Sequence, residues 1–274
     1  MPSDTLNILF VGDVVGSPGR KILAALLPLL RGRHDLHAVI ANVENSAAGY
    51  GLTYPLFAEY EKMGINMMTS GNHIWDRKEI HSFIDREDRL LRPVNYPRPC
   101  PGRGVGRMLV EGLELVVINL MGRVFMRPLD CPFRAIDREL GKLTADPRPR
   151  VVLVDFHGEA TSEKMAMGQY LDARVGAVVG THTHVQTADD RILEGGTAYI
   201  TDVGMTGPQN SVIGMEPRPA IERFLTSRNA RLKPASRRLR LNGALIRFDR
   251  CTGNARSIER VDEGLESENK QAGG

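Results

Sequence analysis

The chain has 274 residues, of which 42% are hydrophobic and 25% are charged, as is typical of a soluble globular protein. Its three cysteines form no CxxC pair, which argues against a disulfide framework or a thiolate zinc site and favours the reducing cytoplasm. No apolar run approaches the roughly 20 residues that a membrane helix needs, and residues 1–7 lack the basic start of a signal peptide. The net charge of +3 suits an anionic substrate without requiring one.

Apolar, β-branched-rich runs alternate with amphipathic stretches along the chain. In chain order the pattern predicts a strand over 6–11, a helix over 18–30 that Pro28 kinks or ends, a strand over 38–43, a helix over 54–63, a strand over 67–70 and a helix capped by Asp76. Further along it predicts a strand over 113–120, helix 132–143, strand 151–156, helix 162–174, and strands 175–179, 198–201 and 244–248. Continuous apolar strands between helices predict an α/β fold whose sheet is covered on both faces.

A single domain fits this length and pattern. We expect it to span residues 1–262, followed by a polar, disordered tail over 263–274. Segment 92–107, rich in Pro, Gly and Arg, is expected to be a loop inside the domain. Segment 205–219 is a candidate lid or assembly segment, so the formation of a homo-oligomer is an open possibility.

Polar residues of metal-ligand types follow five of the predicted strands. They are Asp13, Glu44, Asn45, Asn72, His73, His157, His182 and His184. In sheets of this kind, ligands bind beyond the carboxyl ends of the strands. His182 and His184 are alternate residues of an extended segment, so their side chains point to the same side. The set therefore predicts one site assembled from distant parts of the chain.

The donor types also indicate the metal. Imidazole and carboxylate without thiolate suit Fe, Mn, Zn or Co. The set exceeds what one open catalytic metal uses, and it suits two metals about 3.5–4 Å apart with one carboxylate bridging them. Taken singly, each residue also has a structural explanation: Asp13 as a turn or cap, Asn72 as a left-handed turn residue, and His157 as a hydrogen-bonded strand end.

The segments that carry these residues resemble the calcineurin-like metallophosphoesterases, and more closely their bacterial YmdB-type subfamily. The matching segments are GDVVG (12–16), NVEN (42–45), SGNHIWD (70–76), RPVNYP (92–97) and GTHTHVQTAD (180–189). Three positions depart from the wider superfamily. Val15 replaces a histidine ligand, Glu44 stands where the bridging Asp is expected, and Ile74 replaces an acid.

The resemblance implies a four-layer α/β/β/α sandwich and two metal ions, iron first, with manganese or zinc as alternatives. It assigns one metal to Asp13, Glu44 and His184, and the other to Glu44, Asn72, His157 and His182. It further implies that His73 donates a proton to the leaving alkoxide, or stabilises its charge, and that Asn45 hydrogen-bonds a phosphate oxygen.

The activity implied by the resemblance is a dinuclear-metal phosphodiesterase acting on cyclic nucleotides, 2′,3′-cyclic ones above all, through attack of a metal-bridging hydroxide on phosphorus. A phosphomonoesterase, an RNA-end nuclease and a metal-stabilised regulatory scaffold without turnover are the alternatives. The basic segment 223–240 suits contact with RNA phosphates. However, no Phe or Tyr lies between Arg228 and Arg240, which argues against a stacking platform for single strands.

Overall fold

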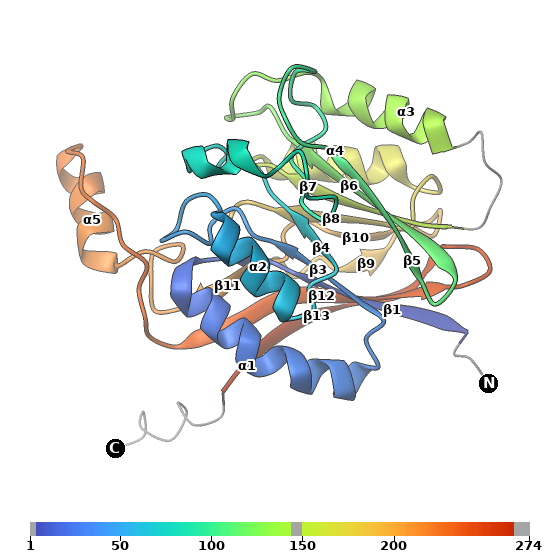
Figure 1. Ribbon diagram of the computed structural model, residues 1–274, viewed down its shortest axis with the longest axis horizontal. Helices are drawn as coiled ribbons and strands as arrows, with labels where there is room; N and C mark the ends of the chain where they lie inside the picture. The colour runs from blue at the N-terminus through green and yellow to red at the C-terminus, as the bar shows by residue number, and fades with distance from the viewer. Residues whose placement is uncertain (1–3, 144–149, 266–274) are drawn as a thin grey trace.

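Two β-sheets lie face to face, and helices cover the outer face of each (Figure 1). The structure is a computed structural model that describes residues 4–143 and 150–265. The seven-stranded sheet contains β1 (Thr5–Val11), β2 (Asp13–Val14), β3 (Ala38–Asn42), β4 (Met67–Thr69), β11 (Met205–Pro208), β12 (Leu239–Asp249) and β13 (Ala255–Gly264). The six-stranded sheet contains β5 (Val105–Val110), β6 (Leu113–Met121), β7 (Arg150–His157), β8 (Ala177–Thr181), β9 (Arg191–Ile192) and β10 (Ala198–Ile200).

The helices divide between the two outer faces. Helices α1 (Gly16–His34) and α2 (Tyr54–Lys62) lie on the seven-stranded sheet, while α3 (Pro132–Leu143) and α4 (Thr161–Leu171) lie on the six-stranded sheet. Helix α5 (Pro217–Thr226) projects from the sandwich, at the left of Figure 1. None of the helices in the described part of the chain is both long and apolar enough to cross a bilayer.

Three buried apolar clusters fill the three interfaces between these layers. Leu9 and Val11 of β1 pack toward α1 and α2, whereas Ile8 and Phe10 of the same strand pack between the sheets. Strands of the second sheet alternate in the same way, and their outward residues pack against α3 and α4. This alternation of side chains explains why the strands are apolar throughout their length. The predicted four-layer α/β/β/α sandwich is confirmed.

The strand directions bring the candidate site residues to one edge of the sandwich. Strand β1 pairs in parallel with β3, and β3 with β4. In the other sheet β6 pairs in parallel with β7, β7 with β8, and β8 with β10. Because parallel strands end on the same side, the turns that follow β3, β4 and β8 lie near the last residue of β7.

Several predicted helix boundaries are wrong; the helix predicted over 162–174, for example, is α4, which ends at Leu171. Helix α1 continues past Pro28 to His34, because Leu26, Leu27 and Leu30 pack into the core on both sides of the proline. Asp76 does not cap an α-helix: it lies in a bend just before a 3₁₀ helix, Lys78–Ser82, and its carboxylate contacts His73 instead.

The sequence pattern also missed several elements, including α5, β5, β11 and β13. Strand β13 is rich in charged residues and pairs with β12 along one edge, where Glu259 forms an ion pair with Arg247. Such an exposed strand lacks the apolar run by which the others were recognised. It includes Glu263 and Gly264, the first residues of the predicted tail, while 266–274 lie outside the described residues.

Candidate metal centre

The Nε2 atom of His157 lies at the centre of a group of electron-pair donors. It is 3.0 Å from Glu44 Oε1, 3.0 Å from Asn72 Oδ1 and 3.0 Å from His182 Nδ1. One ring nitrogen carries at most one hydrogen, so it cannot donate to all three neighbours. Two ligands at right angles on a metal with bonds of about 2.1 Å lie about 3 Å apart. The spacing and donor types therefore fit a cation held among these atoms.

Hydrogen bonds at Nδ1, the ring nitrogen that faces away from Glu44, set the tautomer of His157. Its Nδ1 is 2.9 Å from Thr181 Oγ1, and that hydroxyl donates to Asp155 Oδ1 at 2.7 Å. Since the Thr181 hydrogen is used on Asp155, its oxygen accepts the Nδ1 hydrogen of His157. In the neutral ring the lone pair then belongs to Nε2, which faces Glu44. Histidines that bind metals are oriented by hydrogen bonds of this kind.

His182 and His184 are held in a similar way. His182 Nε2 contacts Glu159 Oε2 at 3.1 Å, and His184 Nδ1 contacts the carbonyl oxygen of Ile213 at 2.9 Å. Both partners are acceptors, so these ring nitrogens donate. The opposite nitrogen of each ring is left for the centre: His182 Nδ1 toward His157, and His184 Nε2 toward Asp13 at 3.9 Å.

Two buried oxygens at the site lack a hydrogen-bond partner among the described residues. They are Asp13 Oδ1 and Asn45 Oδ1. The other carboxylate oxygen of Asp13 accepts the backbone N–H of His182 at 3.2 Å. Burial raises the pKa of Asp13 above its usual value. A buried oxygen without a donor is costly in a protein interior, and a bound cation would compensate it.

The charges of Glu44 and His157 depend on each other. Burial opposes ionisation of both groups, but the nearby His157 and His73 lower the Glu44 pKa to about 2. The carboxylates around His157, Glu44 above all, outweigh its burial and raise its pKa to about 9. Burial and repulsion by His157 lower the pKa of His182 to about 3, so that ring is neutral. A cation at this place would take over the role of the His157 proton.

His73 and Asn45 lie beside the donors. The His73 backbone N–H donates to Glu44 Oε2 at 2.9 Å, and its ring Nδ1 is 2.7 Å from Asp76 Oδ2. The edge of the ring meets Tyr50, with 5.0 Å between ring centroids. Asn45 Nδ2 donates to the carbonyl oxygen of Gly49 at 3.0 Å, which uses one of its two hydrogens.

The structure thus brings together all eight residues singled out from the sequence. It also adds residues that sequence reasoning missed. Asp202 Oδ2 accepts hydrogen bonds from the Thr183 backbone N–H at 3.0 Å, from the Thr183 hydroxyl at 2.8 Å and from Lys164 Nζ at 2.7 Å. These bonds hold the turn in which His182 and His184 adopt positive φ values of 106° and 65°.

A sequence signal for Asp202 existed, because it follows the predicted strand 198–201 just as Asp13 follows the first strand. Lys164 carried no such signal. It lies inside α4 and is fully buried, where its ammonium group neutralises Asp202. Glu159, which orients His182, also lies in a loop with no pattern of its own.

The donors open onto a cavity of about 590 Å³. Glu44, Asn45, His73, His182 and His184 line it. Residues of the 212–215 loop and of α5 also line it. A small molecule can therefore reach the donors and the His73 ring from one open space.

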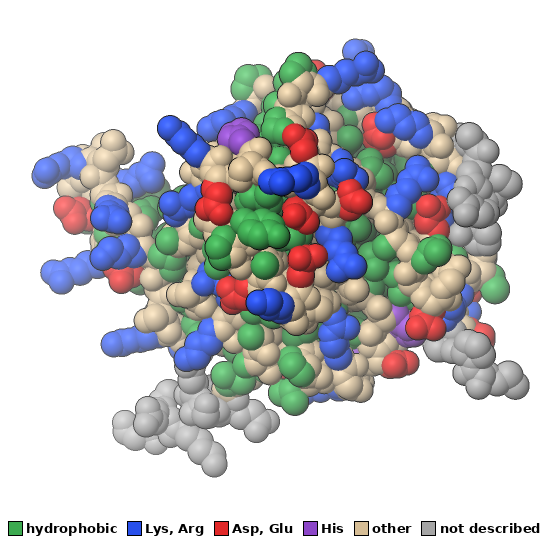
Figure 2. Space-filling model, viewed as in Figure 1, with side chains coloured by type: hydrophobic (Ala, Val, Ile, Leu, Met, Phe, Trp, Pro, Cys, Tyr) green, Lys and Arg blue, Asp and Glu red, His purple; other side chains and the backbone are tan. Residues whose placement is uncertain are grey.

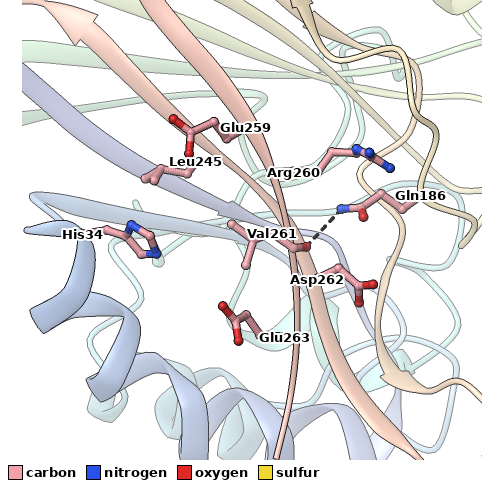
Figure 3. Close-up of a pocket in the computed structure, with 8 residues that line it drawn as sticks. All are labelled: His34, Gln186, Leu245, Glu259, Arg260, Val261, Asp262 and Glu263. Carbon is pink, nitrogen blue, oxygen red and sulfur yellow. Dashed lines mark hydrogen bonds between the residues drawn. The ribbon is translucent and has the colours of Figure 1, made fainter.

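A second cavity, of about 340 Å³, lies against β13 and carries a different chemistry (Figure 3). Gln186 donates there to the Val261 carbonyl oxygen. Three carboxylates line it, but each forms an ion pair with an arginine: Glu259 with Arg247, Asp262 with Arg240, and Glu263 with Arg33. Carboxylates already neutralised in this way do not make a second metal centre.

Comparisons with known proteins identify relatives of this chain. A 2′,3′-cyclic-nucleotide 2′-phosphodiesterase of Bacillus subtilis is 48% identical over 256 residues, which cover 93% of this chain and 96% of that protein. The crystal structure of a Mycoplasma pneumoniae phosphatase matches with a TM-score of 0.88 and 33% identity, covering 97% of each chain. A Staphylococcus aureus structure assigned as a 5′-nucleotidase matches at 14% identity with a TM-score of 0.61, covering 96% of this chain and 57% of that one, and so shares the fold alone.

The family comparison covers most of the chain. The family model described as YmdB-like protein matches residues 9–261, which include all eight candidate site residues. The chain belongs to the YmdB-like protein family.

Proposed function

We propose that this protein is a metal-dependent phosphodiesterase that hydrolyses cyclic nucleotides, with 2′,3′-cyclic substrates favoured. The observation that carries the proposal is the convergence of Glu44, Asn72 and His182 on His157 Nε2, beside an open cavity that Glu44 and His182 line. The substrate follows from the Bacillus subtilis relative, whose name is that of a 2′,3′-cyclic-nucleotide 2′-phosphodiesterase.

The residues fit two metal ions, with iron preferred and manganese or zinc as alternatives. One metal would be held by Asp13, Glu44 and His184, and the other by Glu44, Asn72, His157 and His182. The partnerless Asp13 Oδ1 and the single free nitrogen of each histidine support this assignment. Bound metals would supply Lewis-acid chemistry, by polarising the phosphodiester and lowering the pKa of water.

His73 is proposed to act on the leaving oxygen. Its Nδ1 contacts the Asp76 carboxylate, so the Nδ1 hydrogen is held there and the ring orientation is set. This leaves Nε2 for the cavity that His73 lines. A protonated Nε2 donates its hydrogen to the alkoxide as the P–O bond breaks, while the backbone N–H stays on Glu44.

Asn45 is proposed to bind a non-bridging phosphate oxygen. Its side chain lines the same cavity, and the bond from Nδ2 to Gly49 uses only one amide hydrogen. The remaining hydrogen can donate to the phosphate, beside the carboxylate of Glu44. Such a donor stabilises the charge that builds up on phosphate oxygens during the reaction.

The test is an assay of the purified protein with its metals quantified. Substrates are 2′,3′-cyclic AMP, 3′,5′-cyclic AMP, adenosine 3′-phosphate and a short RNA, each with added Mn²⁺ and with chelator. We expect about two metals per chain and chelator-sensitive hydrolysis that favours 2′,3′-cyclic AMP. Faster hydrolysis of the monoester or of RNA would replace this proposal with a phosphomonoesterase or nuclease. Bound metal without any turnover would favour the regulatory scaffold.

A further inference from the structure

The cavity next to the candidate metal centre is lined by two chemically different groups of residues. One group, which we call the donor end, includes Glu44, His73 and His182. The other group is apolar and comes from a later part of the chain: Ile213 and Met215 from the loop after β11, Phe224 from α5, and Leu232 from the segment after α5. We call this group, together with Arg223, the α5 wall.

The α5 wall presents an aromatic face to solvent. Phe224 is 81% exposed, and Ile213 beside the cavity is 54% exposed. Exposed apolar groups gathered at the mouth of a polar site mark a place where a ligand binds. A flat aromatic ring suits a flat apolar ligand, because stacking needs only a π face.

Arg223 adds a positive charge to the same wall. Within the described residues its guanidinium group has no hydrogen bond or ion pair, and it lines the cavity next to Phe224. Figure 2 shows that Lys and Arg side chains gather on the projecting arm at its left, which α5 occupies in Figure 1. The exposed arginines of this arm include Arg218 and Arg228. An arm of this charge attracts an anionic ligand to the cavity.

Backbone contacts fix the base of the wall. The segments on both sides of α5 are joined by hydrogen bonds from Glu216 N–H to the Lys233 carbonyl and from Ala235 N–H to the Gly214 carbonyl, each 2.9 Å. The backbone of Met215 also forms bridges with Val212 and Pro234. These bonds join the two segments to each other, and the Ile213 carbonyl oxygen lies 2.9 Å from His184 Nδ1, so a ligand meets a preformed surface.

We infer that the α5 wall is the subsite for the nucleobase of the substrate, with the base stacked on Phe224 and Arg223 beside it. The inference rests on the proposed function, because the phosphate must occupy the donor end of the same cavity. The wall then contributes to affinity and leaves the chemical step to the donor end.

The test compares two substrates and two variants. The substrates are 2′,3′-cyclic AMP and methyl ribofuranoside 2′,3′-cyclic phosphate, which has the same reacting group and no base. The variants are Phe224→Ala and the matched control Leu225→Ala, a neighbour on α5 that is 80% exposed and does not line the cavity. We expect Phe224→Ala to raise KM for 2′,3′-cyclic AMP on the order of 10-fold to 100-fold with little change in kcat. KM for the baseless substrate should stay the same in every variant.

Several outcomes would overturn the subsite. One is an unchanged KM for 2′,3′-cyclic AMP in Phe224→Ala, and another is an equal rise for both substrates. Equal losses in Phe224→Ala and Leu225→Ala, with a change in sedimentation, would instead identify α5 as a contact between copies of the chain.

A binding measurement separates this subsite from the proposed function. If the wild-type protein hydrolyses neither cyclic phosphate, the function fails. Calorimetry then compares adenosine 3′-phosphate with ribose 3-phosphate on the metal-loaded wild-type protein and on Phe224→Ala. Tighter binding of the adenosine compound that is lost in the variant supports the subsite, and equal binding of the two compounds ends it.

Discussion

Glu44 Oε1 and His157 Nε2 lie 3.0 Å apart, although the two residues belong to different sheets. Glu44 follows β3 of the seven-stranded sheet, and His157 is the last residue of β7 in the six-stranded sheet. Both side chains are fully buried. The candidate metal centre thus joins the two halves of the sandwich at their shared edge, and its properties depend on how the sheets stack.

The first prediction concerns His73. His73→Ala removes the proposed proton donor and leaves the metal ligands, so we expect full metal content and a loss of kcat of roughly 100-fold to 10,000-fold. His81→Ala is the control, because His81 stacks on Trp75 and does not line the cavity. Metal analysis and steady-state kinetics on the same samples check the prediction. A fully active His73→Ala would refute the proton-donor role.

Gly71 is predicted to accept no side chain. A Cβ at this position would lie 2.1 Å from His157 Cδ2 and 2.3 Å from its Nε2. Gly71→Ala must therefore displace the ring on which the other donors converge, and we expect lost metal and lost activity. Gly32→Ala on α1 meets nothing within 4 Å and should stabilise the helix by about 1 kcal/mol. The two variants are compared by their metal content and by thermal unfolding. Normal metal binding by Gly71→Ala would contradict the prediction.

The buried pair of Lys164 and Asp202 is predicted to stabilise the domain and the His182–His184 turn. Both side chains are only 1% exposed, so Lys164→Met leaves an unpaired carboxylate in the interior. We expect a loss of about 3–5 kcal/mol in the free energy of unfolding, together with weaker metal binding. Lys142→Met breaks an ion pair with Glu139 in which Lys142 is 65% exposed, and should change stability by less than about 1 kcal/mol. Equal losses of unfolding free energy for the two variants in denaturant titrations would contradict the stabilising role of the buried pair.

Metal affinity is predicted to rise with pH. The surrounding carboxylates, Glu44 first among them, hold the pKa of His157 at about 9 against the effect of burial, so the metal-free ring carries a proton below that pH. A metal must displace this proton, whereas Glu44, with a pKa of about 2, and His182, with a pKa of about 3, are already deprotonated at neutral pH. We expect affinity to increase by roughly tenfold per pH unit from 6 toward 9 and then level off. Competition with a chelator measures the metal affinity at each pH. An affinity that does not change over that pH range would show that His157 binds no metal.

Much of the site could be predicted because its residues follow a local rule. Each is polar and stands where an apolar strand ends, and parallel strands end on the same side. Asp202 obeys the same rule and was overlooked. Glu159 and Lys164 obey no local rule, because their importance comes from contacts with His182 and Asp202 that only folding creates.

The α5 wall of the cavity shows a different limit of prediction from the sequence. The sequence pattern missed α5, a helix that projects from the sandwich and has only Ala220 as a buried residue. Its apolar residues Ile221, Phe224 and Leu225 recur at helical spacing, but they are exposed and pack no core, so the helix was not recognised from the sequence. Phe224 could therefore not be assigned to the site from the sequence.

The alternating order of strands and helices, the set of metal-ligand types and the family resemblance could all be read from the sequence, because they are local patterns of polarity and residue identity. Three properties required the folded structure: which nitrogen of each histidine faces the centre, which buried charges support it and which helix completes the cavity. Those properties depend on contacts between segments that are far apart in the chain, and no local pattern encodes their geometry.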